Sequence, residues 1–238
     1  MSRRTDSKRP PSRRGPVPPR VPESRPGPPG GKRDANRRQR TQDLCAAGLA
    51  LFLEQGINPV TIDAIASRAG VAKASFYRYF KDKEELVATL FAPVRDAVLE
   101  ALDACARALS EAHHAEALLP AYQRLGAGLA QLLPAHRAVV LLYLQEARAP
   151  AVGARRPVSE LARAIDQRAL ALTEAARAHA LLRPFDPRTS SLAVVGAAER
   201  LLLGVLRGED VGPPLTLPTA LASLVLDGLR APPAAGPR

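Results

Sequence analysis

Residues 61–86 have the sequence TIDAIASRAGVAKASFYRYFKDKEEL, and this stretch decides the fold of the N-terminal part of the chain. Thr61 stands at an N-cap position, and the apolar residues after it recur at a helical spacing until Gly70. A second short helix is predicted over Lys73–Tyr79, with two phenylalanines four residues apart on one face. Two short helices joined by a glycine turn form a helix-turn-helix, and neither is stable without packing on its neighbours.

The segments on either side are also predicted to be helical. An apolar stripe over residues 37–55 indicates a helix that packs on the first two and ends at Gly56. A capping box at residues 82–85 predicts a long helix over residues 83–110, with a kink or a break at Pro93. Further helices are predicted over residues 115–133, 135–148, 157–182, 187–207 and 216–230. Strand patterns are nearly absent, so the predicted fold class is all-α.

Charge is distributed unevenly along the 238 residues. Residues 1–40 contain thirteen basic and three acidic side chains, whereas the rest of the chain has a net charge of only +1. Because residues 1–35 include nine prolines and almost no apolar side chains, we predict a disordered basic arm there. This arm is either a nucleic-acid-binding segment, a solvated leader, or the product of a start codon placed too far upstream. Residues 231–238 are predicted to be a short disordered tail.

The order of residues in 61–86 closely resembles the DNA-binding pattern of the tetracycline-repressor (TetR) family. The matching positions are Thr61, Ile65, Ala66, Ala69, Gly70, Val71, Phe76, Tyr77, Tyr79, Phe80, Lys83 and Leu86. The resemblance covers about residues 37–90 and departs at Ala72, where the family often has a polar residue that can cap the recognition helix. It implies a helix-turn-helix DNA-binding domain over residues 36–82 and a helical ligand-binding and dimerisation domain over residues 83–230.

The predicted DNA-binding residues are Arg40, Thr61, Lys73, Ala74, Ser75, Tyr77, Arg78, Tyr79 and Lys81. The second helix of a helix-turn-helix lies in the major groove, so residues 73–75 are expected at base edges. The resemblance implies phosphate contacts for Tyr77, Tyr79 and the residues at positions 61 and 81. Arg40 lies at the opening of the first predicted helix, where the DNA backbone is expected to pass, and is a phosphate candidate. The alternatives are a core position for Tyr77, with only its hydroxyl in water, and a solvated charge for Arg78.

The last two predicted helices have an apolar surface that is either an intrachain core or, as the resemblance implies, a four-helix dimer interface. The candidate interface residues are Leu192, Val195, Leu202, Leu203, Leu206, Leu221, Leu224 and Val225. A ligand pocket is expected among the helices of residues 86–182. Polar or aromatic side chains in otherwise apolar segments are its candidates: Phe91, Tyr122, His136, Tyr143 and Gln145. Their apolar surroundings indicate an apolar or amphipathic small molecule.

Nothing in the sequence indicates an enzyme, a cofactor or a metal site. The four histidines lack metal-ligand spacing, no glycine-rich phosphate loop occurs, and neither of the two cysteines has an evident base nearby. No membrane-spanning run is evident, so we expect a cytoplasmic, nucleoid-associated protein. The predicted function is a homodimeric repressor that a small molecule releases from a palindromic operator. The alternative is an architectural protein that uses the basic arm to bind DNA without sequence preference.

Overall fold

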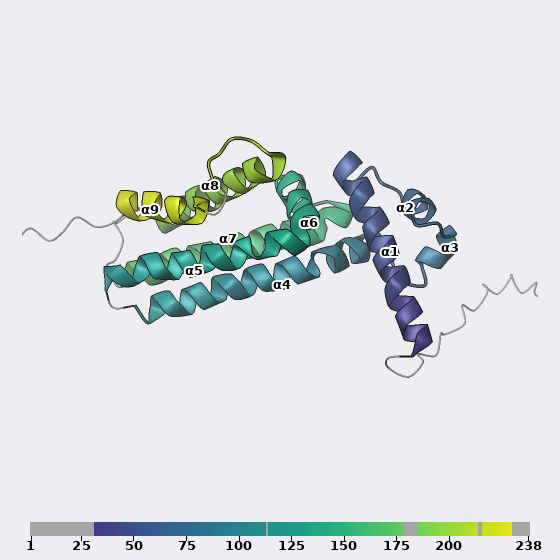
Figure 1. The fold of residues 1–238 in the computed structure, drawn as a ribbon, viewed down its shortest axis with the longest axis horizontal. Coiled ribbons are helices and arrows are strands. Elements are labelled where there is room, and N and C mark those ends of the chain that lie inside the picture. The colour runs from purple at the N-terminus through teal and green to yellow at the C-terminus, as the bar shows by residue number, and fades with distance from the viewer. Residues whose placement is uncertain (1–30, 113, 179–184, 214–215, 230–238) are drawn as a thin grey trace, which may run out of the picture.

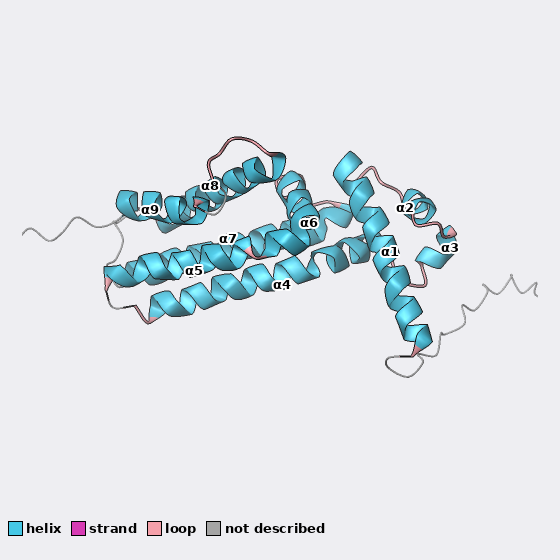
Figure 2. Ribbon diagram, in the orientation of Figure 1, coloured by secondary structure: helices cyan, strands magenta, loops and turns pink. Residues whose placement is uncertain are grey.

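The computed structural model describes residues 31–112, 114–178, 185–213 and 216–229. Figure 2 shows that this described part is helical and contains no strand, which confirms the all-α fold class. The α-helices are α1 (Lys32–Gln55), α2 (Ile62–Arg68), α3 (Lys73–Phe76), α4 (Lys83–Ser110), α5 (Leu118–Ala130), α6 (Leu132–Glu146), α7 (Arg156–Ala178), α8 (Pro187–Arg207) and α9 (Leu217–Leu229). Short 3-10 helices cover Ala115–Ala117 and Gly153–Arg155.

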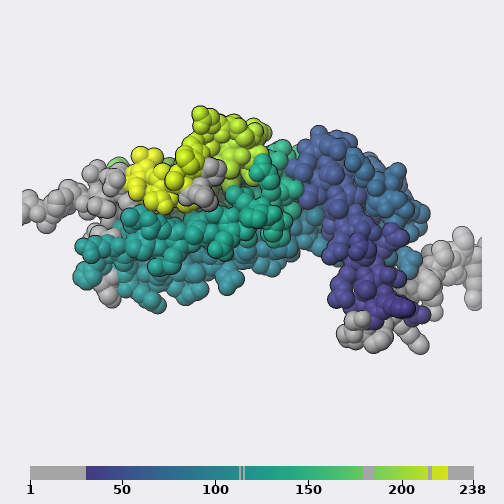
Figure 3. Space-filling model, in the orientation of Figure 1, coloured from purple at the N-terminus to yellow at the C-terminus, as the bar shows by residue number. Residues whose placement is uncertain are grey.

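The helices form an elongated molecule with a small N-terminal unit at one end (Figures 1 and 3). The N-terminal unit consists of α1, α2 and α3, and its core is continuous with the first turns of α4. In the larger part, α4 packs along α7 and α5, while α8 and α9 cover α7 and α5 from one side (Figure 1). Helix α6 contacts both α1 and α4, so it lies at the junction of the two parts.

The capping residues define the helix-turn-helix and the start of α4. The hydroxyl oxygen of Thr61 accepts a hydrogen bond from the amide of Ala64 at 3.1 Å. The Asp82 carboxylate accepts from the amide of Glu85 at 2.8 Å. The reciprocal bond of this capping box is shifted by one residue, because the Glu85 carboxylate accepts from the amide of Lys81 at 2.5 Å. The Asp82 cap therefore satisfies one orphan amide as the sequence predicted, while the Glu85 carboxylate bonds to the residue before the cap.

Two helix boundaries in the N-terminal unit differ from the prediction. Helix α1 begins at Lys32 rather than residue 37, and an ion pair one turn apart, Asp34 with Arg38 at 3.3 Å, supports its first turns. Helix α3 ends at Phe76 rather than Tyr79, because the chain continues there as turns that bring Phe80 into the core. Short-range periodicity does not distinguish such turns from a helix.

Two prolines that the sequence presents as helix breakers, Pro93 and Pro134, lie within helices. Helix α4 continues without a break through Pro93, since Phe91 and Val94 on either side of it are buried and hold the segment in place. Helix α6 spans Leu132–Glu146, but His136 has non-helical backbone angles (φ −127°, ψ 19°), so the segment kinks close to its predicted start at residue 135. Pro134 lies in the first turn, before this kink. A missing N–H costs little there, because the first amides of a helix have no intrahelical acceptor.

Candidate functional site

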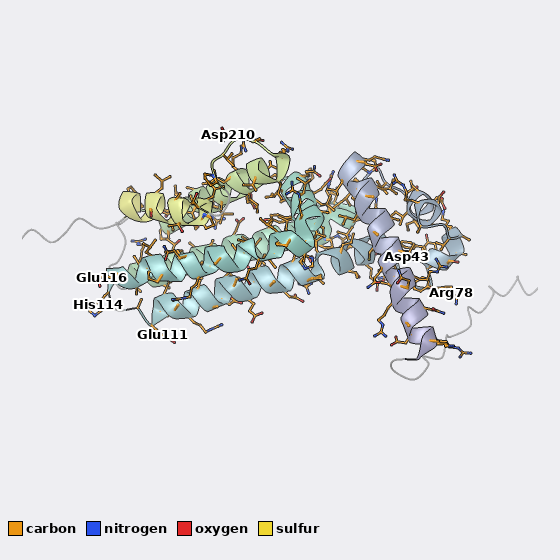
Figure 4. All side chains as sticks on the ribbon, in the orientation of Figure 1. Asp43, Arg78, Glu111, His114, Glu116 and Asp210 are labelled. Atoms are coloured by element: carbon orange, nitrogen blue, oxygen red, sulfur yellow. The ribbon has the colours of Figure 1, made fainter. Side chains whose placement is uncertain are left out.

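The helix-turn-helix presents its predicted DNA-binding side chains to solvent at the outer end of the N-terminal unit. Phe76 and Phe80 are buried, with their ring centroids 5.5 Å apart, and they anchor α3 and the following turns. Ala74 and Arg78 are exposed, and Figure 4 shows Arg78 on the side of the unit away from the α4–α9 bundle. Tyr77 is 52% exposed, so it does not occupy the core position that was its alternative.

The remaining predicted DNA-binding residues surround this face. Lys81 and Arg40 are exposed, whereas Ser75 and Tyr79 are half-buried. Thr61 is exposed, but its hydroxyl caps α2. Helix α2 starts directly after this exposed residue, and the N-terminus of a helix favours an anion. A surface of hydroxyls, basic groups and one methyl side chain can make both phosphate and base-edge contacts.

Lys73 is paired within the unit, a contact that the sequence did not predict. Its ammonium group donates to the Asp63 carboxylate at 2.8 Å, and both side chains are exposed. The hydrogen bond to Asp63, followed by the attraction between the two charges, raises the pKa of Lys73. The pair joins the first turn of α2 to the first turn of α3. Lys73 must therefore exchange this partner for DNA if it is to contact a base or a phosphate.

Lys83, which matched the sequence pattern, has a structural role in this chain. Its ammonium group donates to three backbone carbonyls of the turn between α1 and α2, those of Ile57, Asn58 and Val60, at 2.8, 2.9 and 2.7 Å. Partial burial, with a contribution from the charge of Arg155, lowers the pKa of Lys83. The first residue of α4 thus fixes the turn that leads into α2.

Replacing Lys83 is expected to destabilise the protein. The Lys83→Met variant keeps most of the side-chain volume but loses three charge-assisted hydrogen bonds and leaves carbonyls unpaired. We expect the free energy of unfolding to fall by about 2–3 kcal/mol. Urea denaturation of the full-length chain followed by circular dichroism measures this change. The control is Lys81→Met, whose exposed ammonium group has no hydrogen-bond partner in the described part of the chain, and its effect should stay within about 0.5 kcal/mol. Equal stability of the two variants would contradict the role of Lys83.

A second polar contact ties the same turn to α6. Glu146, at the end of α6, is only 5% exposed, and its carboxylate accepts a hydrogen bond from the amide of Ile57 at 3.1 Å. Its other carboxylate oxygen pairs with the guanidinium of Arg155. Gly56 has φ +82°, and a Cβ at this position would lie 2.9 Å from the Glu146 carboxylate. The glycine is therefore required both by its backbone conformation and by the approach of Glu146.

A cavity of about 340 Å³ lies in the larger part of the molecule. Its walls come from α4, α5, α6, α7, α8 and α9, and they consist mainly of leucine, valine and alanine side chains. Of the five predicted ligand-binding residues, Tyr122 and Tyr143 line this cavity. Phe91 belongs to the buried core near the N-terminal unit and borders a separate, open hollow between α4 and α7. The other two candidates, His136 and Gln145, lie outside the cavity, and Gln145 is exposed.

The polar groups of the cavity are few. The Tyr143 hydroxyl donates to the Glu199 carboxylate at 2.8 Å, and Arg148 donates to the other oxygen of Glu199 at 3.0 Å. Burial, reinforced by the nearby charge of Glu199, raises the pKa of Tyr143 above the ordinary value of a tyrosine. The Tyr122 hydroxyl has no hydrogen-bond partner among the described residues, and burial raises its pKa as well. Both phenols therefore stay protonated at neutral pH.

Helices α8 and α9 leave an apolar surface uncovered. Leu192 is 47% exposed and Leu224 is 72% exposed, and Leu203 is half-buried. The other half-buried candidates, Val195, Leu202 and Leu221, line the cavity within the chain. Leu206 was a wrong prediction for this surface, because it is buried in the core of its own chain near the end of α8. The side chain of Val225 lies outside the part that the structure describes.

Helix α8 has a composition that is unusual for a surface helix. Among the described helices, it alone is long and apolar enough by itself to cross a membrane. Its most apolar stretch of 18 residues has a mean hydropathy of 1.4, and only 17% of that stretch is buried in the structure. That α8 is apolar enough to cross a membrane is not evident in the sequence, because the charged residues Glu199 and Arg200 interrupt the apolar run. An apolar helix with so little burial needs a further cover.

Within the described ranges, no group of three or more histidine, cysteine or carboxylate side chains is placed to hold a metal ion. Burial raises the pKa values of Cys45 and Cys105 to about 11, so both thiols remain protonated at neutral pH.

The chain is similar to known regulators. Residues 44–90 match the model of the family described as bacterial regulatory proteins, tetR family. Over 80 residues the chain is 38% identical to the HTH-type transcriptional regulator TcmR of Streptomyces glaucescens. This match covers 34% of the chain and 35% of TcmR, so the chain spans only about a third of the curated relative's length. The relative is a regulator of transcription, which agrees with the prediction that the chain is not an enzyme.

Solved structures extend the similarity to the whole fold. The MbdR regulator from Azoarcus sp. CIB superimposes with a TM-score of 0.61 and 22% identity, over 81% of this chain and 100% of that one. FadR from Bacillus subtilis in complex with stearoyl-CoA superimposes with a TM-score of 0.57 and 18% identity, over 79% and 98% of the two chains. At such low identity the similarity establishes only the fold. The sequence match shows that the N-terminal unit carries the helix-turn-helix of the tetR family of bacterial regulatory proteins, and the solved structures show that the rest of the chain shares their fold.

Proposed function

We propose that this protein is a homodimeric transcriptional repressor that leaves a palindromic operator when a small, largely apolar molecule enters the cavity. The observation that supports this most strongly is the exposed recognition surface at the end of the N-terminal unit, formed by Ala74, Tyr77 and Arg78. Such a repressor works in the cytoplasm, at the nucleoid. The unit over residues 36–82 binds DNA, and residues 83–230 form the ligand-binding and dimerisation domain.

The proposed contacts with DNA follow from the positions of the side chains. The residues at the start of α3, Lys73 to Ser75, contact base edges in the major groove. The hydroxyls of Tyr77 and Tyr79, the basic groups of Arg40, Arg78 and Lys81, and the amides near Thr61 contact phosphates. Phosphate contacts set the register of the protein on the duplex, and the α3 side chains supply the sequence preference.

The proposed dimer uses the uncovered surface of α8 and α9. One helix-turn-helix contacts a single half-site, and a two-fold dimer doubles these contacts on a palindrome. The exposed side chains of Leu192 and Leu224 supply the apolar centre that such an isologous interface needs. A four-helix arrangement, with α8 and α9 from each protomer, buries these leucines and covers the sparsely buried helix α8.

The proposed release is a shift between two conformations. A ligand in the cavity contacts α4 through Val94 and Val98, and α4 begins at Lys83, which holds the turn before α2. A ligand that fits better when α4 has moved favours a dimer in which the two recognition helices no longer match their half-sites. The similarity to FadR, a structure that contains stearoyl-CoA, supports a cavity of this kind in the same fold.

Operator selection by the full-length protein tests this function. The full-length chain selects duplexes from a random pool, and fluorescence anisotropy then measures its affinity for the enriched sequence and for a scrambled control at two salt concentrations. The proposed function requires a two-fold symmetric sequence, bound at least a hundredfold more tightly than the scramble. Weak and equal binding to both duplexes, falling steeply with salt, would instead indicate the architectural function. The second step adds a panel of apolar small molecules, and at least one of them must weaken operator binding.

Removing the partner of Lys73 is expected to strengthen DNA binding. The Asp63→Asn variant frees the ammonium group and removes a negative charge from the DNA-facing surface. Exposed ion pairs contribute at most about 1 kcal/mol, so we expect about two- to fivefold tighter binding to the selected duplex. Anisotropy titrations measure this change. The matched control is Glu54→Gln. It breaks the exposed ion pair between Glu54 on α1 and Arg68 on α2, whose charged groups are 3.1 Å apart, and it should leave the affinity for DNA unchanged. Weaker binding by the Asp63 variant would mean that the pair aligns Lys73 for its contact.

A further inference from the structure

We infer that the cavity accepts an elongated apolar molecule whose polar group is neutral or positively charged, and that it rejects molecules with a free carboxylate. This inference rests on the proposed function, because it defines the chemical class of the ligand for that site. Three features of the cavity lead to it: the length of the walls, the sign of the charge in them, and a hydroxyl that lacks a partner.

The length of the cavity follows from the helices that form it. Its lining on α7 extends from Leu161 to Thr173, which corresponds to about 18 Å at 1.5 Å per residue. Its lining on α4 extends over about two turns, from Val94 to Leu102. With a volume of about 340 Å³, a cavity of this length is narrow and suits an extended ligand.

The charge in the cavity wall is negative. Glu199 is the one charged residue among the described lining residues, and no lysine, arginine or histidine lines the cavity there. Arg148 pairs with Glu199, but its side chain is 74% exposed, so water screens its charge. Asp166 on α7 adds a second carboxylate whose charge acts on Tyr143, next to Glu199. A ligand carboxylate would lose its hydration beside these groups without gaining a cation, which is strongly unfavourable.

The unpaired hydroxyl lies in a different region of the cavity. Tyr122 packs in the cluster that contains Leu102 and Leu172, whereas Tyr143 belongs to the cluster that contains Val140 and Leu161. The Tyr122 phenol can both donate and accept a hydrogen bond, and in the described structure it does neither. The Tyr122 oxygen is not among the fully buried unpaired atoms of the described residues, so it keeps contact with the solvent-accessible space of the cavity, and a ligand hydroxyl or carbonyl can take the place of water there.

Three probes with the same chain separate these effects. Dodecanol, dodecylamine and dodecanoate differ only in the group at the end of the chain, which at pH 7.5 is neutral, positive and negative, respectively. Isothermal titration of each probe, below its aggregation concentration, into the full-length protein measures the affinities. We expect the alcohol and the amine to bind with dissociation constants in the micromolar range. We expect the carboxylate to bind at least tenfold more weakly than the alcohol.

Two variants assign the selectivity to residues. Glu199→Gln removes the charge, and it is expected to strengthen dodecanoate binding about tenfold while weakening dodecylamine binding. Tyr122→Phe removes the hydroxyl, and it is expected to weaken dodecanol binding several-fold without strengthening dodecanoate binding. Glu209→Gln is the matched control, because this glutamate pairs with Arg200 outside the cavity lining and should change none of the three affinities.

The outcomes are distinct from those that test the repressor function. Equal or tighter binding of dodecanoate overturns the charge selectivity, and so does an unchanged pattern in the Glu199 variant. Failure of all three probes to bind overturns the assignment of an elongated amphiphile to the cavity. None of these results affects the duplex selection experiment, which decides separately whether the protein is a sequence-specific regulator.

Discussion

A chain with glutamate at both exposed leucines, Leu192→Glu together with Leu224→Glu, is expected to be monomeric and to lose at least a hundredfold in affinity for the selected operator. The reason is that both substitutions place a charge at the centre of the proposed α8–α9 interface. A desolvated and unpaired carboxylate is strongly unfavourable, and the two protomers would bring four of them together. Without the dimer, each protomer contacts only one half-site of the operator. The affinity for the operator therefore falls, because the contacts with the second half-site are lost.

Two measurements check this result. Sedimentation velocity gives the oligomeric state of the wild type and the variant, and fluorescence anisotropy gives the affinity for the same duplex. The control is Val152→Glu, because Val152 is also an exposed apolar residue, at 54%, but it precedes α7 and lies away from α8 and α9. A variant that remains a dimer would move the interface to another surface. Unchanged operator affinity in a true monomer would contradict the need for two half-sites.

Removal of the Glu146 carboxylate is expected to lower the free energy of unfolding by about 3–5 kcal/mol. The Glu146→Ala variant leaves the guanidinium of Arg155, on a side chain that is only 18% exposed, without its partner and the buried amide of Ile57 without an acceptor. Both groups lie where α6 meets the turn between α1 and α2, so the docking of the N-terminal unit on the bundle weakens. Thermal unfolding and urea titration of the full-length chain measure the loss.

A second substitution distinguishes the ion pair from simple packing. In the double variant Glu146→Leu with Arg155→Met, apolar side chains replace both charges, and such replacements are often close to neutral. We therefore expect the double variant to be more stable than Glu146→Ala. Glu160→Ala on the exposed side of α7 is the control and should change stability by no more than about 0.5 kcal/mol. A loss below about 1 kcal/mol in Glu146→Ala would show that the buried pair contributes little.

Elements with local start and stop signals were predicted well. The long helix α4 has the predicted limits. Its start is set by a signal contained in four consecutive residues, the hydrogen bond between the Asp82 carboxylate and the amide of Glu85. Helix α8 also has the predicted limits, with Asp186 capping its first turn and Gly208 in a left-handed conformation at its end. These signals act over one turn of chain, so they are visible in the sequence.

Boundaries that depend on packing were predicted less well. The end of α3 was misplaced, since the choice between helix and turn there depends on which side chains reach the core. The position of Leu206 shows the same limit. The apolar pattern of α8 contains enough leucines for two faces, and only the packing of α8 on its own chain identifies Leu206 as buried and Leu192 as exposed.

By itself, the sequence determined the helix-turn-helix and the all-α fold, because these depend on short-range spacing and capping. The tertiary structure decided which groups meet across the chain. It brought Glu146 to the amide of Ile57, 89 positions away, and Tyr143 to the carboxylate of Glu199, 56 positions away. Such contacts depend on the angles at which helices pack, and no local pattern of residues specifies those angles. The charge of the cavity and the junction between the two parts of the molecule follow from these long-range contacts.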